Sequence, residues 1–431
     1  MISQTLTVSL AYGEREISVE LPANRVTAIL TSKEVPAITD VEDKVREMLD
    51  KPIASPPLRE LAKGKKTACV VISDITRPVP NKVILPPLLH YLEDAGIKRE
   101  NILILIATGL HRPNLGEELE RMVGKEVVDN YRIENHNARD KSQQKYIGTT
   151  QRGTEIWINK LYLESDLKIL TGLIEPHFMA GYSGGRKSIC PGIAGVDTVK
   201  IQHGPHFLEH PNADNGIVEG NPFHEEALEI AKKVGVDFIL NVTINKRRQV
   251  TGIFAGQLEK AWEEGVRFVE SYVKVGIDAP VDIVLTHGGG APLDATFYQT
   301  VKGMVGALPI LKPGGSIVIV SSCSEGVGSE EFRTLLWQSE SLEKTVQRMY
   351  DPANFIIDQW EVEMLAKVYK KAKDVYLYTD GLTPEEIEHC FVKSTKNIEK
   401  TINELLEAYG KDAKIAVISE GPYIIPYIKY E

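Results

Sequence analysis

Short apolar runs alternate with charged, helix-like stretches along most of the chain. The run at 67–73 (TACVVIS) precedes a helical stretch at about 85–93, and the run at 101–107 (NILILIA) precedes one at 116–124 (GEELERMVG). A continuous apolar strand is typical of a parallel sheet, whose strands are buried on both faces and joined by helices. The pattern therefore predicts an α/β fold with mostly parallel sheets.

Other periodicities surround these repeats. Residues 1–21 alternate apolar and polar side chains around Gly13, which predicts a hairpin, and 41–50 (VEDKVREMLD) has the pattern of a charged helix. We also expect strands at 154–158 and 165–170, an antiparallel hairpin at 236–256 and a helix at 257–274. Three strand ends would then face one crevice, at the edge where open α/β sheets bind ligands.

A second α/β pattern begins after 276–280. A strand that runs into a glycine-rich turn is expected at 281–292, a strand and loop at 314–326, and further strands at 374–380 and 414–421, with helices between them. We therefore predict two domains, 1–275 for catalysis and cofactor binding and 276–431 as a C-terminal α/β domain, with the active-site cleft between them. The pattern leaves open whether the tail, 414–431, packs back on the first domain.

Composition narrows the class of protein. The chain of 431 residues has a net charge of -10 and no basic run, which argues against nucleic acid or an anionic membrane as a partner. No apolar run is long enough to cross a bilayer, and the N-terminus lacks the basic start and apolar block of a signal peptide. The four cysteines are dispersed. We expect a cytoplasmic protein with reduced cysteines.

The stretch 172–195 (GLIEPHFMAGYSGGRKSICPGIAG) is a long glycine-rich loop between an expected strand and an expected helix. It combines Gly184 and Gly185 with Ser183, Arg186 and Lys187, the chemistry of an anion-binding loop. The alternative is a wide turn whose glycines only permit a tight path.

Polar residues at the strand ends are the candidates for catalysis. Asp74 and Arg77 follow the first strand, His111 follows the second, and His177 lies in the glycine-rich loop. Each has a structural alternative, such as a helix cap or a hydrogen-bonded loop histidine. Two histidines at converging strand ends favour acid and base chemistry, because imidazole titrates near neutrality.

Other motifs are weaker. His203, His206 and His210 have helical spacing, but Gly204 and Pro205 would interrupt the helix, so a three-histidine zinc site is a poor interpretation. No GxxxxGK[ST] or GxGxxG nucleotide fingerprint is present. The residues alone support an α/β enzyme that binds an anionic small molecule between two domains and uses histidine acid and base groups.

Four ordered motifs, SDITRPVPN, ATGLHRPN, EPHFMAGYSGGRKSICPGIAG and FYQTVKG, resemble those of the nickel-pincer lactate racemases. The resemblance implies a pyridinium mononucleotide whose two sulfur arms and ring carbon hold nickel. Lys187 matches the lysine that is covalently joined to one arm, and His203 matches the fourth nickel ligand. Proteins that build the cofactor would then be partners of this chain.

The resemblance also implies the reaction. Hydride would leave Cα of a 2-hydroxy acid and return to the other face of a 2-keto acid, with His111 and His177 as the two acid/base groups. Arg77 and Lys302 match residues that hold the substrate. The remaining expected contacts are to substrate at Asp74, Tyr298, Gln299 and Trp360, and to cofactor at Thr76, Ser183, Gly184, Gly185 and Arg186.

The expected reaction is the interconversion of L- and D-lactate or of a similar short-chain 2-hydroxy acid. Two alternatives stay open: a racemase or epimerase of a larger 2-hydroxy acid such as malate, and a non-catalytic protein that binds the pincer nucleotide. A carrier would need neither His111 nor His177. A nicotinamide dehydrogenase is disfavoured, because the dinucleotide fingerprint is missing.

Overall fold

The computed structural model describes residues 4–429; the expectations for 1–3 and 430–431 lie outside the described residues. By contacts, the chain forms two compact units. The N-terminal unit comprises 34–203 and 212–271, and the C-terminal unit comprises 204–211, 272–429 and the described part of 1–33. The predicted boundary between 275 and 276 therefore differs from this division at the start of the chain, at 204–211 and at 272–275.

The N-terminal unit is built on a six-stranded sheet in the order β13-β12-β9-β4-β5-β6. All neighbours are parallel except β12 and β13, which form the predicted antiparallel hairpin. Its strands are β4 (Ala68–Ser73), β5 (Ile102–Ala107), β6 (Arg132–Asn135), β9 (Leu167–Leu173), β12 (Phe238–Ile244) and β13 (Val250–Gly256).

The composition of these strands explains their position. The first five residues of β4 and of β5, ACVVI and ILILI, are all buried, because side chains on both faces of a central parallel strand meet helices. One core joins β4, β5, β9 and β12 to α1 (Val41–Asp50), α2 (Leu58–Ala62), α3 (Asn81–Asp94), α4 (Gly116–Val123) and α5 (Lys125–Asn130).

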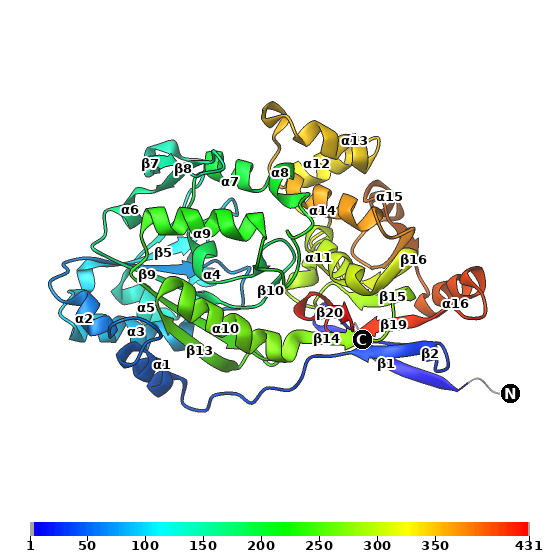
Figure 1. Cartoon of the computed structure of the whole chain (residues 1–431), viewed down its shortest axis with the longest axis horizontal. Helices are drawn as coiled ribbons and strands as arrows, with labels where there is room; N and C mark the ends of the chain where they lie inside the picture. The colour runs from blue at the N-terminus through cyan, green and yellow to red at the C-terminus, as the bar shows by residue number, and fades with distance from the viewer. Residues whose placement is uncertain (1–3, 430–431) are drawn as a thin grey trace. The chain divides into compact units, whose positions relative to one another are not determined.

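The other face of this sheet is crossed by α9 (Pro222–Val234), drawn in green in Figure 1. The side-chain oxygen of Asn221 accepts from the backbone N–H groups of Phe223 and His224, and Pro222 occupies the first turn, which fixes where this helix begins. The remaining helices of the unit are α6 (Lys160–Leu163), α7 (Val196–Gln202) and α10 (Leu258–Val273).

The expected strand at 154–158 is present as β8 (Glu155–Asn159), but it is not part of the large sheet. It pairs antiparallel with β7 (Gln144–Thr149) in a separate two-stranded sheet. Ile156 and Ile158 are buried, whereas Glu155 is exposed and Trp157 is half-buried, which is typical of a strand with one solvated face. The three strand ends that can form a site are therefore those of β4, β5 and β9.

The C-terminal unit has an all-parallel six-stranded sheet in the order β18-β17-β16-β15-β19-β3. Its strands are β3 (Val26–Leu30), β15 (Val281–His287), β16 (Leu311–Val320), β17 (Asp374–Tyr378), β18 (Lys393–Thr395) and β19 (Ile415–Ile418). Its helices are α8 (Pro205–Leu208), α11 (Phe297–Ala307), α12 (Glu330–Gln338), α13 (Leu342–Met349), α14 (Gln359–Tyr369), α15 (Pro384–His389) and α16 (Ile398–Tyr409).

The first and last segments of residues 4–429 belong to this unit. The predicted N-terminal hairpin, β1 (Thr5–Tyr12) and β2 (Arg15–Pro22), packs with α16 on one face of the sheet, and β3 pairs with β19. In the tail, β20 (Ile425–Ile428) pairs with β14 (Lys274–Ile277). The assignment of residues 4–33 to the first domain is thus wrong, because backbone pairing places β3 in the C-terminal sheet.

No helix among residues 4–429 is long and apolar enough to cross a membrane. All four cysteines are buried, and none is paired in a disulfide.

Candidate active site

The candidate site lies at the carboxyl edge of the N-terminal sheet. Strands β9, β4 and β5 are adjacent and parallel, so the segments that follow them leave the sheet at the same edge. These segments carry Asp74 and Arg77 after β4, His111 after β5, and His177 and Lys187 after β9. Gly109 N–H donates to the Gly192 carbonyl over 2.9 Å, which joins the segment after β5 to the glycine-rich loop.

Asp74 and His111 form a hydrogen-bonded pair. His111 Nδ1 lies 2.7 Å from Asp74 Oδ2, and Thr76 Oγ1 donates to Asp74 Oδ1 over 2.6 Å. Burial alone would raise the pKa of Asp74, but the neighbouring His111, Thr76 and Arg77 outweigh it and lower that pKa. A carboxylate can only accept, so Nδ1 of His111 carries a proton, and in the neutral form of the ring the lone pair is then on Nε2.

The segment that holds His111 is anchored by a second network. Asn114 Oδ1 accepts from Ile75 N–H over 3.2 Å, which ties it to the segment after β4, and Asn114 Nδ2 donates to Glu118 over 2.7 Å. Arg112 binds both oxygens of Glu118 at 2.7 Å. These bonds lower the pKa of Glu118 to about 2. Sequence reasoning gave Asn114 and Glu118 no role, although both lie in or beside the ATGLHRPN motif.

His177 and Lys187 form the second pair. His177 lies on the small hairpin of β10 (Pro176–His177) and β11 (Gly181–Tyr182), and Lys187 lies on a 3-10 turn, η3 (Gly185–Ser188). Lys187 Nζ is 3.0 Å from His177 Nε2. His177 Nδ1 accepts from the backbone N–H groups of Met179 and Ala180 at 3.2 and 3.3 Å.

The backbone between these two residues requires glycine. Gly184 has φ +77°, and a Cβ there would lie 3.0 Å from Asn241 Oδ1, the atom that accepts from Gly185 N–H over 2.9 Å. Both glycines therefore shape the turn that presents Lys187. This geometry agrees with the alternative given above for the glycines, a tight path for the backbone.

The Arg186 side chain forms its hydrogen bonds within the glycine-rich loop. It is 1% exposed, and its two terminal nitrogens donate to the carbonyl oxygens of Ala180, Tyr182 and Gly184 at 2.9, 2.9 and 3.2 Å. Its guanidinium lies 4.1 Å from the centre of the Trp262 ring, and burial lowers its pKa to about 9. The donors of Arg186 are thus used within the loop, and its expected contact with the cofactor stays a prediction.

Ser183 has a similar internal role. Its hydroxyl donates to the Leu173 carbonyl over 2.6 Å, and its own carbonyl accepts from Trp262 Nε1 over 2.8 Å. The loop is therefore held by its own side chains. Trp262 was not among the predicted residues, and nothing local in its sequence marks it.

His203 ends α7. As predicted, the helix does not continue to the other two histidines, because α8 begins afresh at Pro205. Burial, with the charge of Lys187, lowers the pKa of His203 to about 3, so its ring is neutral. Nδ1 lies 3.2 Å from the Val199 carbonyl, and Lys187 and His111 both influence its titration. Among residues 4–429, no group of three or more His, Cys, Asp or Glu side chains is arranged to hold a metal ion.

Arg77 is half-buried, and its Nε lies 4.0 Å from Glu175 Oε1. Glu175 precedes the small hairpin that carries His177. The contact therefore brings the segment after β4 against the loop after β9. The N-terminal unit collects Asp74, Arg77, His111, His177, Lys187 and His203 at one sheet edge.

The predicted residues of the C-terminal unit form their own cluster. Tyr298, Gln299 and Lys302 lie on α11, and Trp360 on α14 donates from Nε1 to Tyr298 Oη over 2.7 Å. Burial raises the pKa of Tyr298 well above its ordinary value. Sequence reasoning missed Glu361, whose full burial raises its pKa to about 8 although Lys302 opposes the shift. The substrate-binding roles of this cluster stay predictions.

The chain is similar to known proteins over nearly its full length. Residues 12–216 match the family model of the lactate racemase N-terminal domain, and 277–425 match that of the lactate racemase C-terminal domain. It is 37% identical to lactate racemase from Thermoanaerobacterium thermosaccharolyticum, with 97% of this chain and 98% of that protein covered. It is 33% identical to lactate racemase from Lactiplantibacillus plantarum, with 97% and 99% covered.

Solved structures agree. The lactate racemase apoprotein from T. thermosaccharolyticum superposes with a TM-score of 0.92 at 35% identity, covering 99% of this chain and all of that one. A Thermotoga maritima protein has a TM-score of 0.68 at 20% identity, covering 90% of this chain and 98% of its own, a likeness of fold alone. The chain thus belongs to the lactate racemase family and is an enzyme, an isomerase of the racemase type.

Proposed function

We propose that this enzyme interconverts L- and D-lactate with a nickel-pincer nucleotide joined to Lys187. The proposal rests chiefly on one observation: two histidines, one paired with a carboxylate at 2.7 Å and the other with a lysine at 3.0 Å, follow the parallel strands on either side of β4 to one sheet edge. The family supplies the substrate class, since both curated relatives are lactate racemases.

The chemistry of His203 fits the proposed metal. A nickel ligand must be a neutral imidazole, and burial keeps His203 neutral by lowering its pKa to about 3. Its Nδ1 faces the Val199 carbonyl at 3.2 Å, so the ring proton is on Nδ1 and the lone pair is on Nε2. One protein ligand would suffice if the bound nucleotide supplied the other donors to the metal.

Hydride chemistry suits the substrate. The Cα–H of a 2-hydroxy acid is a very weak acid, and a hydroxyl cannot form the imine that activates amino acids. When bound, the nickel-pincer group would accept hydride from Cα and return it. The protein must then move only the hydroxyl proton.

The two histidines are prepared for opposite roles. Because Asp74 holds the proton on Nδ1 of His111, Nε2 of His111 is the atom that takes the hydroxyl proton. Because Nδ1 of His177 accepts two backbone N–H groups, Nε2 of His177 carries a proton and can return it to oxygen. Racemisation needs such a group on each side of the substrate.

Arg77 is the candidate for the substrate carboxylate. Its guanidinium can offer two parallel N–H donors, and its contact with Glu175 is long, at 4.0 Å, so it can reorient towards a substrate. We propose that it orients the 2-hydroxy acid at the sheet edge that carries both histidines. Proteins that build the pincer nucleotide are proposed as the source of the cofactor.

The test is to produce the chain with and without the cofactor-building proteins of a lactate-racemising bacterium. Peptide mass spectrometry locates any adduct, metal analysis measures nickel, and chiral chromatography follows D-lactate formed from L-lactate. We expect an adduct at Lys187, about one nickel per chain, and D-lactate only from the co-produced protein. A Lys187→Arg variant is the matched control and should lose all three.

Protein that carries the adduct and nickel but forms no D-lactate would refute lactate as the substrate. The remaining hypotheses would then be a different 2-hydroxy acid as substrate or a non-catalytic carrier of the nucleotide. Protein with neither adduct nor nickel would refute the cofactor.

A further inference from the structure

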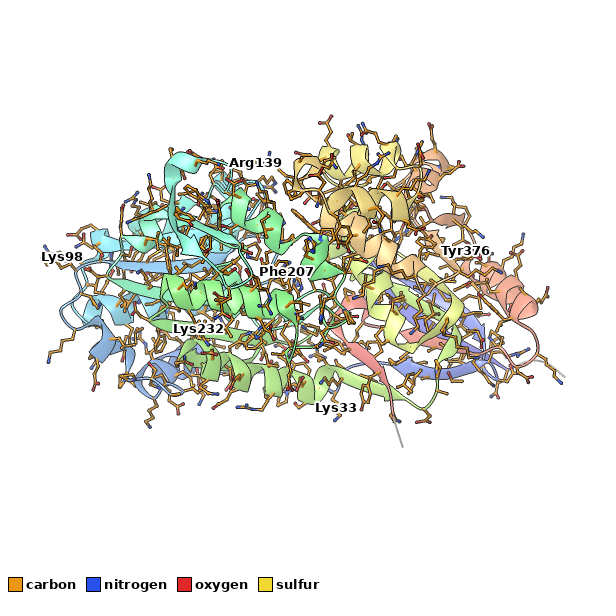
Figure 2. The ribbon with its side chains drawn as sticks, turned by 45° about the horizontal axis from the view of Figure 1, so that its top comes forward. Lys33, Lys98, Arg139, Phe207, Lys232 and Tyr376 are labelled. Atoms are coloured by element: carbon orange, nitrogen blue, oxygen red, sulfur yellow. The ribbon has the colours of Figure 1, made fainter. Side chains whose placement is uncertain are left out.

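A pair of asparagines joins the end of β6 to the segment that carries His111. Asn114 N–H donates to Asn135 Oδ1 over 2.8 Å, and Asn135 Nδ2 donates back to the Asn114 carbonyl over 3.0 Å. Asn135 is the last residue of β6, so both backbone polar groups of Asn114 are fixed to the strand beside β5. Figure 2 shows Arg139, which follows β6 at this edge of the sheet, well apart from Lys98, which precedes β5 at the opposite edge.

The side chain of Asn114 makes two further hydrogen bonds. It is 1% exposed; its Oδ1 accepts from Ile75 N–H over 3.2 Å, and its Nδ2 donates to Glu118 Oε1 over 2.7 Å. Hydrogen bonds from Arg112 lower the pKa of Glu118 to about 2, so its carboxylate is ionised and can only accept. The amide of Asn114 must therefore turn its NH2 group to the carboxylate and its oxygen to Ile75 N–H.

Ile75 is the backbone neighbour of the carboxylate that binds His111. It lies between Asp74, whose Oδ2 is 2.7 Å from His111 Nδ1, and Thr76, whose hydroxyl donates to the other carboxylate oxygen over 2.6 Å. His111 and Asn114 lie in the same segment after β5. The amide bond to Ile75 and the imidazole–carboxylate bond therefore join the same two segments at two points, and each restricts the movement that would break the other.

The segment between β5 and α4 needs such ties, because residues 108–115 form no helix or strand. Its start is fixed by two bonds: His111 N–H donates to the Thr108 carbonyl over 2.9 Å, and the Thr108 hydroxyl donates to the His136 carbonyl over 2.6 Å. Its end is fixed at Asn114. Since 43% of the His111 side chain is exposed, packing alone does not orient the imidazole ring. Hydrogen bonds must supply the remaining restraint.

We propose that Asn114 is a positioning residue for His111: by tying the segment after β4 to the segment after β5, it holds Asp74 Oδ2 against His111 Nδ1. Without this tie the pair would separate part of the time, and the neutral ring would then also adopt the tautomer with its proton on Nε2. That tautomer has no lone pair at Nε2 to take a hydroxyl proton. The catalytic consequence rests on the proposed function; the effect of Asn114 on the pair does not.

Nitrogen-15 NMR of the histidine-labelled full chain, made without cofactor, tests the effect on the pair. Spectra are taken at about pH 9, where an ordinary imidazole is neutral, and the shifts of the two ring nitrogens give the ratio of the tautomers. The signals of His111 are those that vanish in His111→Gln. A hydrogen bond to a carboxylate should hold the Nδ1–H tautomer in roughly 10- to 100-fold excess. In Asn114→Ala we expect this ratio to fall by about 3- to 10-fold, the effect of one neutral hydrogen bond.

A second pair of variants tests the tie by restoring it. Asn114→Asp keeps an acceptor for Ile75 N–H but places a second carboxylate against Glu118, so the tautomer ratio should fall as it does in Asn114→Ala. Adding Glu118→Gln supplies an amide donor opposite the new carboxylate and keeps the net charge of the unaltered chain. The double variant should return the ratio to within about twofold of the original. This pair decides the question even if Asn114→Ala does not fold.

Tyr162→Phe is the control for a general loss of stability. The Tyr162 hydroxyl donates to the Gly235 carbonyl over 2.9 Å, and these residues precede β9 and β12 at the opposite edge of the same sheet. This variant also loses one hydrogen bond, but the His111 tautomer ratio should stay within about 1.5-fold. An unchanged ratio in Asn114→Ala, an equal fall in Tyr162→Phe, or a double variant that restores nothing would overturn the proposal.

Kinetics of the loaded enzyme test the catalytic consequence. Asn114→Ala should lower kcat by about 3- to 10-fold and change KM less than about twofold, because Asn114 acts through His111. A lowered tautomer ratio with unchanged kcat would overturn the role of Asn114 in the reaction. The NMR experiment uses no lactate, nickel or nucleotide. A failed racemase assay would therefore leave the NMR result intact, and an unchanged tautomer ratio would leave the racemase proposal intact.

Discussion

Replacing Asp74 with asparagine tests how far the pair at 2.7 Å prepares His111 as a base. Asp74 is 5% exposed and ionised at neutral pH, since its neighbours lower its pKa in spite of burial. A hydrogen bond to a charged acceptor contributes about 1.5–3 kcal/mol, and one to a neutral acceptor about 0.5–1.5 kcal/mol. The amide of the introduced asparagine can also donate from its NH2 group to Nδ1 of His111. That bond favours the His111 tautomer with its proton on Nε2, which cannot accept another proton there.

The difference of about 1–2 kcal/mol corresponds to roughly 5- to 30-fold in rate, and loss of the tautomer preference adds to it. We expect Asp74→Asn to lower kcat by about 10- to 100-fold, with KM changed less than about threefold, because the carboxylate lies behind His111. The assay is D-lactate formation from L-lactate, normalised to bound nickel.

Thr76→Val is the matched control. It removes a neutral donor, at 2.6 Å, from the same carboxylate, so kcat should fall less than about fivefold. Melting temperatures of both variants establish that the fold is intact. An Asp74→Asn enzyme with kcat within threefold of the unaltered enzyme, or with an effect confined to KM, would refute the role given to this pair.

Arg186→Met should lower the free energy of unfolding by about 2–4 kcal/mol in denaturant titrations, because carbonyls of the glycine-rich loop lose their donors; unchanged stability with weaker cofactor loading would instead favour a phosphate contact. Glu118 has a folded-state pKa of about 2, below the roughly 4.3 of an unfolded glutamate, so its contribution to stability is present above about pH 5 and is lost as pH falls towards 2. The melting temperature of Glu118→Gln should therefore lie below that of the unaltered chain at pH 7, and the gap should narrow below about pH 4 and close near pH 2; a constant gap would contradict this. His203→Ala should keep the adduct on Lys187 but bind at least tenfold less nickel by metal analysis, and full nickel retention would remove His203 as the ligand.

Local pattern predicted much of the N-terminal unit. The continuous apolar runs of β4 and β5 and the polar residues after them identified the sheet edge, since such runs have no solvated face. The break between His203 and His206 was also predictable, because a glycine and a proline separate them. These features depend on residues that are close in sequence.

Features that depend on distant residues were not predictable. Strand β3 joins the C-terminal sheet by pairing with β19, almost 390 residues further along the chain, and its short exposed-and-buried pattern gives no sign of that partner. Arg186 looked like an anion ligand because its neighbours are glycines and a lysine. The hydrogen bonds from Arg186 to backbone carbonyl oxygens depend on the fold of the loop and on the Trp262 ring, which comes from α10.

Deuterium tracing tests the central claim most directly. Loaded enzyme is incubated with L-lactate carrying deuterium at Cα in ordinary water, and the D-lactate is analysed by chiral chromatography with mass detection. Because hydride would leave and return without meeting solvent, we predict that the D-lactate formed early in the reaction retains the deuterium. D-lactate that has exchanged its deuterium for solvent hydrogen would contradict hydride transfer and show proton abstraction at Cα instead.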